Sequence, residues 1–271
     1  SSKEKKNLTS YFRGTELQGY FEKIEAKDIK SSLKPQYVDK LSQVVKGNTG
    51  GLLEKVDERG VSKELIQELD LTDALDKDIS VLSGGELQRV AVIASMSKDA
   101  DIYFLDEPTS YLDIKQRLNV AKSIRNLAEQ KTVVVIEHDL AILDYLSDNI
   151  HILYGQPGVY GIVSTPLGVR VGINMYLDGY IKEDNVRFRE ESIKFYQKEE
   201  KSLKSKKVLL EYPSFEKNYD SFSLKTEGGT LHKGEVIGIV GPNATGKSTF
   251  IKILAGVLEP DNGNKFETEL K

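Results

Sequence analysis

Residues Gly241 to Ser248 follow the pattern G-x-x-x-x-G-K-S, which is typical of a loop that holds phosphate groups. An apolar run, Val236–Val240, precedes the loop, and we expect a buried strand there and a helix over Phe250–Val257. In that setting backbone N–H groups and a helix N-terminus surround phosphate oxygens, Lys247 reaches the β and γ phosphates, and Ser248 ligates Mg²⁺. The sequence therefore predicts a nucleotide site. Its expected contact residues are Gly241, Pro242, Asn243, Ala244, Thr245, Gly246, Lys247, Ser248 and Thr249.

A pair of carboxylates, Asp106 and Glu107, ends the apolar run Ile102–Leu105. An isolated acidic pair at a strand end is often only solvated. Phosphoryl transfer needs one carboxylate to hold Mg²⁺ and a second group to orient or deprotonate the attacking water. We expect Asp106 to hold the metal, through water, and Glu107 to act on the water.

The segment Ser83-Gly84-Gly85-Glu86 opens a predicted helix. Such a turn can be an ordinary helix N-cap. It can also bind an anion, because Ser83 offers a hydroxyl and the two glycines let backbone N–H groups approach a γ-phosphate. The following Leu-Gln-Arg sequence favours the second interpretation, in which all four residues contact nucleotide.

Further candidate positions are single polar or aromatic residues. His138 follows the β-branched run Val133–Ile136, at the carboxyl edge where ligands bind in open α/β sheets, and we expect it to contact the γ-phosphate. Tyr219 either stacks on adenine or simply packs. His151 and His232 lack such a context, and we expect them to be structural or surface residues.

Composition sets outer limits on function. The net charge of −4 argues against a surface that coats polyanions as a whole. The chain has no cysteine, which removes iron–sulfur and thiolate chemistry from it. It also lacks an apolar run of the roughly 20 residues that span a bilayer.

The coarse pattern alternates apolar strands with amphipathic helices, which predicts an α/β fold with a doubly wound parallel sheet. We expect helices over residues 15–30, 61–76 and 114–129, the last with Leu118, Ala121, Ile124 and Leu127 facing inward. Residues 166–207 contain short glycine-bearing pieces and then a charged run, which we interpret as a hinge and a solvated linker.

The signature at 82–89, the acidic pair with residues 108–113, and Glu137-His138-Asp139 together resemble the ABC ATPase superfamily. More specific strings resemble the RNase L inhibitor family of ribosome-splitting ABC proteins, and most of all its archaeal members. These strings are YFRGTELQ (11–18), KPQYVD (34–39), SYLDIKQRL (110–118), LDYLSD (143–148), VGIN (171–174), LDGY (177–180) and NVRFR (185–189).

The resemblance implies a P-loop fold with a helical subdomain and a helix–loop–helix insertion at about 11–30. It implies a first ABC domain over 1–165 without its own phosphate loop, a hinge over 166–205, and the start of a second ABC domain over 206–271. Gln36 would be the Q-loop glutamine linking Mg²⁺ and water. Relatives usually have glycine at the position of Ala244. If that position needs a positive φ, alanine costs about 1 kcal/mol.

The implied cofactors are ATP and Mg²⁺, without an iron–sulfur cluster in this chain. The implied partners are ribosomal subunits, release-factor-type proteins and the rest of a twin-ATPase chain, in the cytoplasm and away from membranes. ABC sites are composite, so the chain would hold two facing half-sites, and neither site would be complete. Three alternatives stay open: a transporter ATPase subunit, an inactive nucleotide-binding module, and a circular permutant that brings Lys247 to Asp106 and Glu107.

Overall fold

The computed structural model describes residues 13–15, 18, 19, 22, 29–40, 45–195 and 207–262. The chain divides into two compact units, Ser1–Ile193 and Lys194–Lys271, and each is described by itself. The helix expected over 15–30, and with it the insertion at about 11–30, lies mostly outside the described residues.

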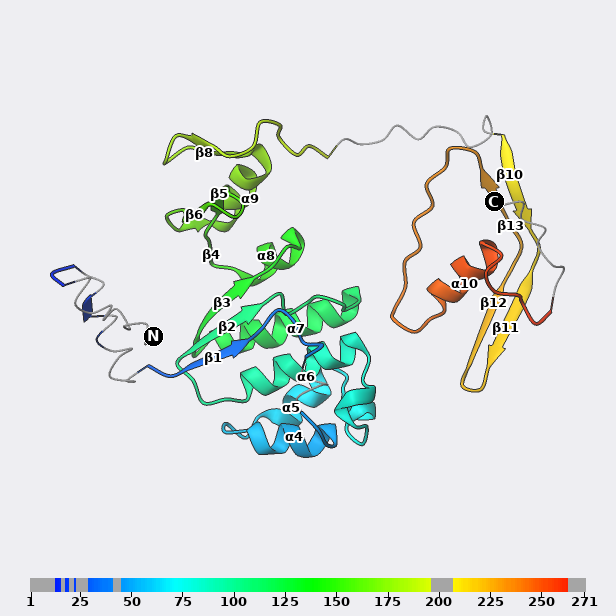
Figure 1. The fold of residues 1–271 in the computed structure, drawn as a ribbon, viewed down its shortest axis with the longest axis horizontal. Coiled ribbons are helices and arrows are strands. Elements are labelled where there is room, and N and C mark those ends of the chain that lie inside the picture. The colour runs from blue at the N-terminus through cyan, green and yellow to red at the C-terminus, as the bar shows by residue number, and fades with distance from the viewer. Residues whose placement is uncertain are drawn as a thin grey trace, which may run out of the picture. The chain divides into compact units, whose positions relative to one another are not determined.

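A three-stranded parallel sheet forms the centre of the first unit (Figure 1). Its strands, in spatial order, are β1 (Ser31–Lys34), β2 (Ile102–Asp106) and β3 (Thr132–Ile136). The strands β2 and β3 are the predicted ones. Both pairings are parallel, so the carboxyl ends of all three strands lie at one edge. This edge is where sequence reasoning placed the acidic pair and His138.

Helices cover one face of this sheet. Figure 1 shows α6 between the sheet and the pair α4 and α5, while α7 packs on β3. The helix bounds are α4 Thr49–Val56, α5 Ser62–Glu68, α6 Gly84–Met96, α7 Ile114–Ala128 and α8 Leu140–Leu146, with 3₁₀ turns at Thr72–Ala74 and Ile79–Val81. Buried side chains such as Val92, Ile93, Tyr103 and Leu105 join the sheet and helices into one core.

The opposite face of the sheet is exposed, whereas the expected doubly wound sheet would have helices on both faces. Leu33, Val134 and Ile136 are 66%, 47% and 52% exposed, whereas Val133 and Val135 pack against the core. Leu118 was also wrongly placed, since it is 42% exposed while Ala121, Ile124 and Leu127 are buried.

Residues 149–189 complete the first unit with short strands and a helix. Helix α9 (Val169–Asp178) contacts α8 and β4, and ends at Gly179, whose φ of 71° suits a left-handed C-cap. The strands are β4 Asn149–Ile150, β5 Leu153–Gln156, β6 Tyr160–Val163, β7 Leu167–Gly168, β8 Tyr180–Ile181 and β9 Val186–Arg187. The boundary between the two units, after Ile193, falls within the hinge that we expect over 166–205. The three-part domain division stays a prediction.

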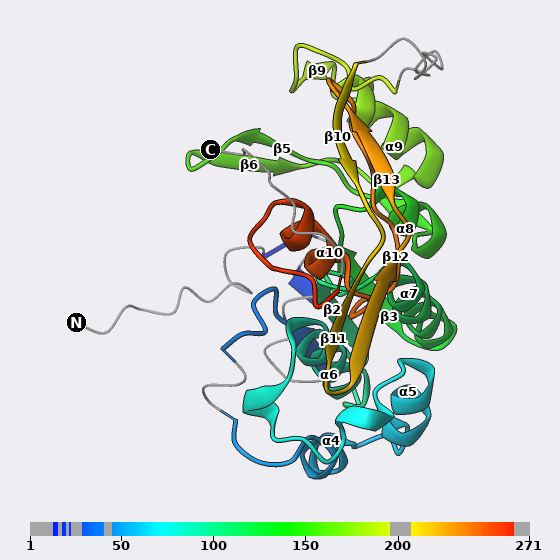
Figure 2. The ribbon, with the colours of Figure 1, turned by 90° about the vertical axis from the view of Figure 1, so that its right-hand side faces the viewer.

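The described residues of the second unit form two antiparallel strand pairs and one helix, and Figure 2 shows the strands side-on, running vertically. The pairs are β10 (Val208–Tyr212) with β13 (Gly229–His232), and β11 (Phe215–Tyr219) with β12 (Phe222–Thr226). Helix α10 (Lys247–Leu254) joins them through Phe250, which stacks on Phe215 at 6.1 Å between ring centroids. It begins three residues before the predicted helix start.

The expected strand Val236–Val240 is not a strand in the structure. Its side chains are exposed, Val236 by 89% and Val240 by 81%. A strand needs a neighbour to receive its backbone hydrogen bonds. In the described part of this unit β10 pairs with β13 and β11 with β12, and a single further bridge joins Glu216 to Asn262, so none of these strands pairs with residues 236–240.

Candidate active site

Three side chains converge on the carboxylate of Glu107, which follows β2 directly. Gln36 Nε2 donates a hydrogen bond to Glu107 Oε1 at 2.6 Å, and His138 Nε2 lies 3.2 Å from the same oxygen. Ser110 Oγ donates to Oε2 at 2.9 Å. The structure thus brings together Glu107, His138 and Gln36, which the sequence analysis proposed from separate strings. Ser110 is an additional member of this group.

The environment of Glu107 favours its ionised form. The hydrogen bond from Ser110 is the main cause that holds the pKa of Glu107 below its ordinary value, and it acts with Gln36 and His138 against the opposing effect of burial. The carboxylate is therefore charged at neutral pH. A charged carboxylate beside two polar side chains can orient a water molecule or accept a proton.

Two buried donors hold the backbone of Glu107, and sequence reasoning missed both. Lys34 is fully buried, and its ammonium donates to the carbonyl oxygens of Asp106 at 2.7 Å and Glu107 at 3.2 Å. Gln88 of α6 is also fully buried and donates to the Glu107 carbonyl at 2.6 Å. Glu107 has a φ of 48°, a left-handed conformation that non-glycine residues rarely adopt. These donors stabilise that conformation and so fix where the carboxylate points.

A further contact joins the loop after Glu107 to the histidine segment. The backbone N–H and hydroxyl of Thr109 both donate to Glu137 Oε1, at 3.0 and 2.7 Å. Glu137 directly precedes His138, so this contact fixes the two loops at the sheet edge relative to each other. The sequence signal was present in the Glu-His-Asp string, but it did not indicate what Glu137 binds.

The predicted signature residues form the N-terminus of α6 as a capping box. Ser83 is the N-cap, and its hydroxyl accepts from the Glu86 N–H at 3.3 Å while Glu86 Oε2 accepts from the Ser83 N–H at 2.8 Å. Gly84 and Gly85 occupy the first two helical positions, whose N–H groups have no acceptor within the helix. The N-cap interpretation is confirmed, and the cap leaves two backbone donors at the helix N-terminus, while contact with a nucleotide stays a prediction.

The phosphate-binding loop lies in the second unit and closes on its own lysine. Lys247 Nζ donates to the carbonyl oxygen of Gly241 at 2.7 Å and to that of Pro242, which also accepts from the Thr245 hydroxyl. Ala244 has a φ of 61°, so the position does require the left-handed conformation that glycine would adopt without strain. Lys247, Ser248 and Thr249 form the first turn of α10.

Gly246 must be glycine for two reasons. Its φ is 87°, and an added Cβ would lie 2.7 Å from the Phe222 ring. The Phe222 ring stacks on Tyr219, with centroids 6.3 Å apart, and Tyr219 is 47% exposed. Tyr219 is thus tied to the loop through one intervening ring, and its exposed area is available to a planar ligand.

The predicted magnesium ligands are oxygen donors, as this ion prefers. Asp106 and Gln36 belong to the first unit and Ser248 to the second. Among the described residues, no group of three or more His, Cys, Asp or Glu residues gathers to hold a metal. Because Mg²⁺ is often held by one or two carboxylates, waters and substrate phosphates, Asp106, Gln36 and Ser248 fit it as partial ligand sets.

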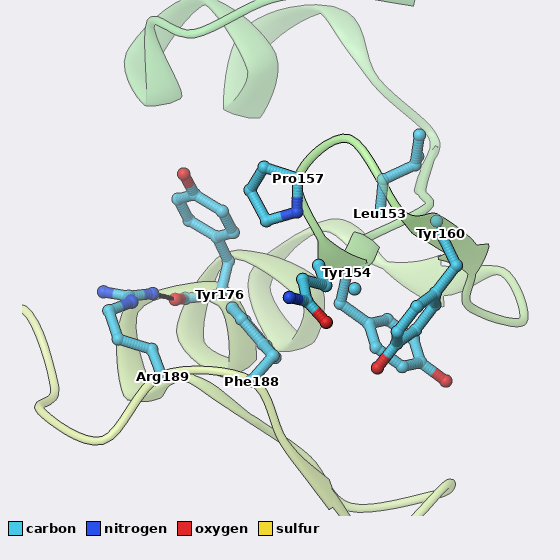
Figure 3. Close-up of a pocket in the computed structure, with 10 residues that line it drawn as sticks. Leu153, Tyr154, Pro157, Tyr160, Tyr176, Phe188 and Arg189 are labelled. Atoms are coloured by element: carbon cyan, nitrogen blue, oxygen red, sulfur yellow. Dashed lines mark hydrogen bonds between the residues drawn. The ribbon is translucent and has the colours of Figure 1, made fainter.

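A separate shallow pocket of about 440 Å³ lies between the β5–β6 hairpin and the end of α9 (Figure 3). Tyr154 and Tyr160 come from the hairpin, Tyr176 from α9, and Phe188 and Arg189 from the following segment. The Arg189 guanidinium lies over the Tyr176 ring at 5.4 Å. None of the predicted site residues line this pocket.

No helix in the described part of the chain is both long and apolar enough to cross a membrane.

Comparison with known proteins identifies the family of the chain. The ABC transporter family model matches residues 6–110 and 224–269. An uncharacterized ABC transporter ATP-binding protein of Methanocaldococcus jannaschii is 55% identical over 95% of this chain and 42% of its own length. The translation initiation factor RLI1 of Saccharomyces cerevisiae is 46% identical over 96% of this chain and 44% of its own.

Solved structures also show similarity to ABC ATPases of this kind. An archaeal ribosome recycling factor, aABCE1, solved in complex with the ribosomal stalk protein aP1, matches with a TM-score of 0.86 and 54% identity. The match covers 95% of this chain and 50% of that one. ABCE1 in a model of a ribosome-bound complex with archaeal Pelota matches with a TM-score of 0.89, covering 97% and 44%. The chain thus spans about half the length of the relatives it matches.

The chain belongs to the ABC ATPase family and has its P-loop α/β fold. Within that family it belongs to the ABCE1/RLI1 branch, which the RNase L inhibitor strings indicated.

Proposed function

We propose that this chain is the ATP-binding and ATP-hydrolysing core segment of a twin-ATPase ribosome-recycling factor. The observation that carries the proposal is the convergence of Gln36, Ser110 and His138 on the ionised Glu107 carboxylate. Membership of the ABCE1/RLI1 branch supports the proposal that ATP binding and hydrolysis act on the ribosome. It also supports a cytoplasmic location.

Each residue has a definite task in this proposal. Glu107 orients the attacking water and accepts its proton, while Gln36 and His138 turn from Glu107 toward the water and the γ-phosphate once nucleotide binds. Lys247 leaves the carbonyls of Gly241 and Pro242 for the β and γ phosphates. Tyr219 stacks on the adenine. Asp106, Gln36 or Ser248 would hold Mg²⁺, which would neutralise phosphate charge when bound.

The two units supply different halves of composite sites. The second unit carries the phosphate loop Gly241–Thr249 and the first carries the signature Ser83–Glu86, and each is half of a composite site in this proposal. Asp106, Glu107 and His138 would serve another such site, whose phosphate loop is not in this sequence. The proposed division is a first ABC domain over 1–165, a hinge over 166–205 and a second ABC domain from 206.

ATP turnover of the chain, with Glu107→Gln as control, tests the catalytic part. In an incomplete composite site, we expect ATP binding without turnover. Turnover that Glu107→Gln lowers by about 10²-fold or more would instead support a circular permutant with a rebuilt site. Loss of ATP binding in the wild-type chain would contradict the proposal, and Lys247→Ala gives the reference for absent binding.

Ribosome engagement needs its own experiment. Relatives in solved structures are bound to a ribosomal stalk protein and to the ribosome with Pelota. We expect the chain to co-sediment with archaeal small or large ribosomal subunits in the presence of a non-hydrolysable ATP analogue. Co-sedimentation with membrane vesicles and not with subunits would favour a transporter ATPase subunit.

A further inference from the structure

The signature loop carries a negative charge at the point where the proposed function requires it to bind a phosphate. Glu86 Oε2 accepts from both the N–H and the hydroxyl of Ser83, at 2.8 and 2.7 Å. The carboxylate therefore lies at the N-terminus of α6, beside the N–H groups of Gly84 and Gly85. A helix N-terminus attracts anions, but a resident carboxylate opposes the approach of another.

The carboxylate of Glu86 is firmly ionised. Burial alone would raise its pKa, but hydrogen bonds from Lys77 and from the N–H and hydroxyl of Ser83 outweigh burial and lower the pKa to about 2. Protonation at neutral pH therefore does not remove this charge. Another group must compensate for it if the loop is to hold a phosphate.

Lys77 is the compensating group. Its ammonium lies 2.8 Å from Glu86 Oε1, on the carboxylate oxygen that Ser83 does not use. The Glu86 side chain is only 17% exposed, so water screens this ion pair less than the open pairs on the surface.

The backbone of Lys77 is fixed as well. The N–H and hydroxyl of Thr49, the fully buried first residue of α4, both donate to the Lys77 carbonyl oxygen, at 3.0 and 2.9 Å. The Lys77 N–H donates to the Ala74 carbonyl at 3.2 Å. The backbone of Lys77 is thus held from both sides, by α4 and by the 3₁₀ turn Thr72–Ala74. A lysine in a flexible surface segment would lack these contacts.

We infer that Lys77, which lies outside the signature motif, is a positioning residue for it. By neutralising Glu86, Lys77 leaves the N–H groups of Gly84 and Gly85 able to bind a terminal phosphate. This inference deepens the proposed function and rests on it. It predicts that removal of Lys77 harms phosphate binding only while Glu86 is charged.

The test uses the full chain, labelled with ¹⁵N, and titrates it with inorganic pyrophosphate at constant ionic strength. The backbone amide signals of Gly84 and Gly85 report binding, and the remainder of the spectrum reports folding. In Lys77→Met we expect the apparent Kd at these amides to rise about threefold to tenfold, the size of one poorly screened charge near the ligand. In Lys77→Met/Glu86→Gln, which removes the uncompensated carboxylate charge, we expect the apparent Kd to fall below that of Lys77→Met.

Lys98→Met is the matched control. Lys98 pairs with Glu58 at 2.7 Å with similar lysine exposure, but it lies beyond the opposite end of α6. We expect no change in pyrophosphate binding in this variant. A purely structural role for Lys77 would leave the double variant as weak as the single one, which would overturn the inference.

The two levels of the proposal fail in different ways. If pyrophosphate shifts the Gly84 and Gly85 amide signals with the same Kd in the wild type and in Lys77→Met, charge compensation by Lys77 is wrong. Phosphate binding by the signature then still stands. If the wild-type amides of Gly84 and Gly85 do not respond to pyrophosphate, both are wrong.

Discussion

At the scale of single residues, left-handed backbone conformations occur at two non-glycine positions of the candidate site. Glu107 has a φ of 48° and Ala244 a φ of 61°. Buried donors on Lys34 and Gln88 bind the Glu107 carbonyl and hold its conformation in place. At Ala244 the strain lies in an exposed loop, so it is open to direct test.

Replacing Ala244 with glycine should stabilise the second unit by about 0.5–1 kcal/mol, because relief of the left-handed strain exceeds the added entropy of the unfolded chain. Urea unfolding, monitored by amide hydrogen exchange in β10–β13, measures this change in the unfolding free energy of the second unit. Ala255→Gly is the control. Ala255 has a φ of −79° at the end of α10, so glycine there should destabilise by a similar amount. Equal signs for both substitutions would contradict the strain argument.

Lys34 should make stability depend on alkaline pH. Burial lowers its pKa from 10.5 to about 8, against the attraction of Asp106, Glu107 and Glu137. Between those values the unfolded chain binds more protons than the folded chain, so this residue's contribution to stability rises with pH. Below about pH 8 both states are protonated and the full cost of burying the charge remains.

Urea unfolding of wild type and Lys34→Met on either side of this range measures that contribution. The difference in unfolding free energy between the two should grow by about 2 kcal/mol in favour of wild type from pH 7.5 to pH 10. Lys30→Met, whose side chain is 67% exposed, is the control for the loss of a lysine from the surface. A constant difference across the range would show that Lys34 does not titrate as described.

At the scale of elements, the short β5–β6 hairpin depends on one glycine of a facing pair. Gly155 and Gly161 lie opposite each other. Gly155 has a φ of 146°, and an added Cβ would lie 2.3 Å from the Tyr160 carbonyl oxygen, whereas a Cβ on Gly161 meets nothing within 4 Å. The aromatic pocket in Figure 3 takes Tyr154 and Tyr160 from this hairpin, so its shape depends on Gly155.

Gly155→Ala should therefore disrupt the hairpin, while Gly161→Ala should be tolerated within about 0.5 kcal/mol. Amide chemical shifts of residues 153–163 and quenching of tyrosine fluorescence by acrylamide report the two outcomes. Equal tolerance of both alanines would show that the hairpin can shift its register without cost.

At the scale of the whole molecule, each unit leaves apolar surface exposed. In the first unit this surface is the open face of the sheet, with Leu33, Val134 and Ile136. In the second it is the segment Val236–Val240, which reads as a central strand but has no strand partner among the described residues. Exposed apolar patches of this kind favour association.

Val134→Thr should reduce binding of a hydrophobic dye and self-association at high concentration, with little effect on stability. The neighbouring Val133→Thr points to the opposite face, where a hydroxyl meets the core, and should destabilise by about 1–2 kcal/mol. Sedimentation velocity and urea unfolding separate the two effects. If both variants behave alike, the sheet face is covered in solution.

The sequence by itself determined the motifs and the family, because these depend on short strings whose spacing is fixed by local backbone geometry. The loop around Lys247, the cap at Ser83 and the acidic pair after β2 are of this kind. Strand β1, with the sequence Ser-Ser-Leu-Lys, carried no strand signal, because its pairing with β2 and not its own composition makes it a strand.

Only the tertiary structure decided what Glu107 touches, which lysines support the site and which apolar runs find partners. Lys34 and Gln88 are polar residues whose burial depends on elements distant in sequence, and the pairing of Lys77 with Glu86 spans a turn that no motif describes. The run Val236–Val240 shows the converse. Its composition is that of a buried strand, yet a strand exists only where neighbouring strands receive its hydrogen bonds.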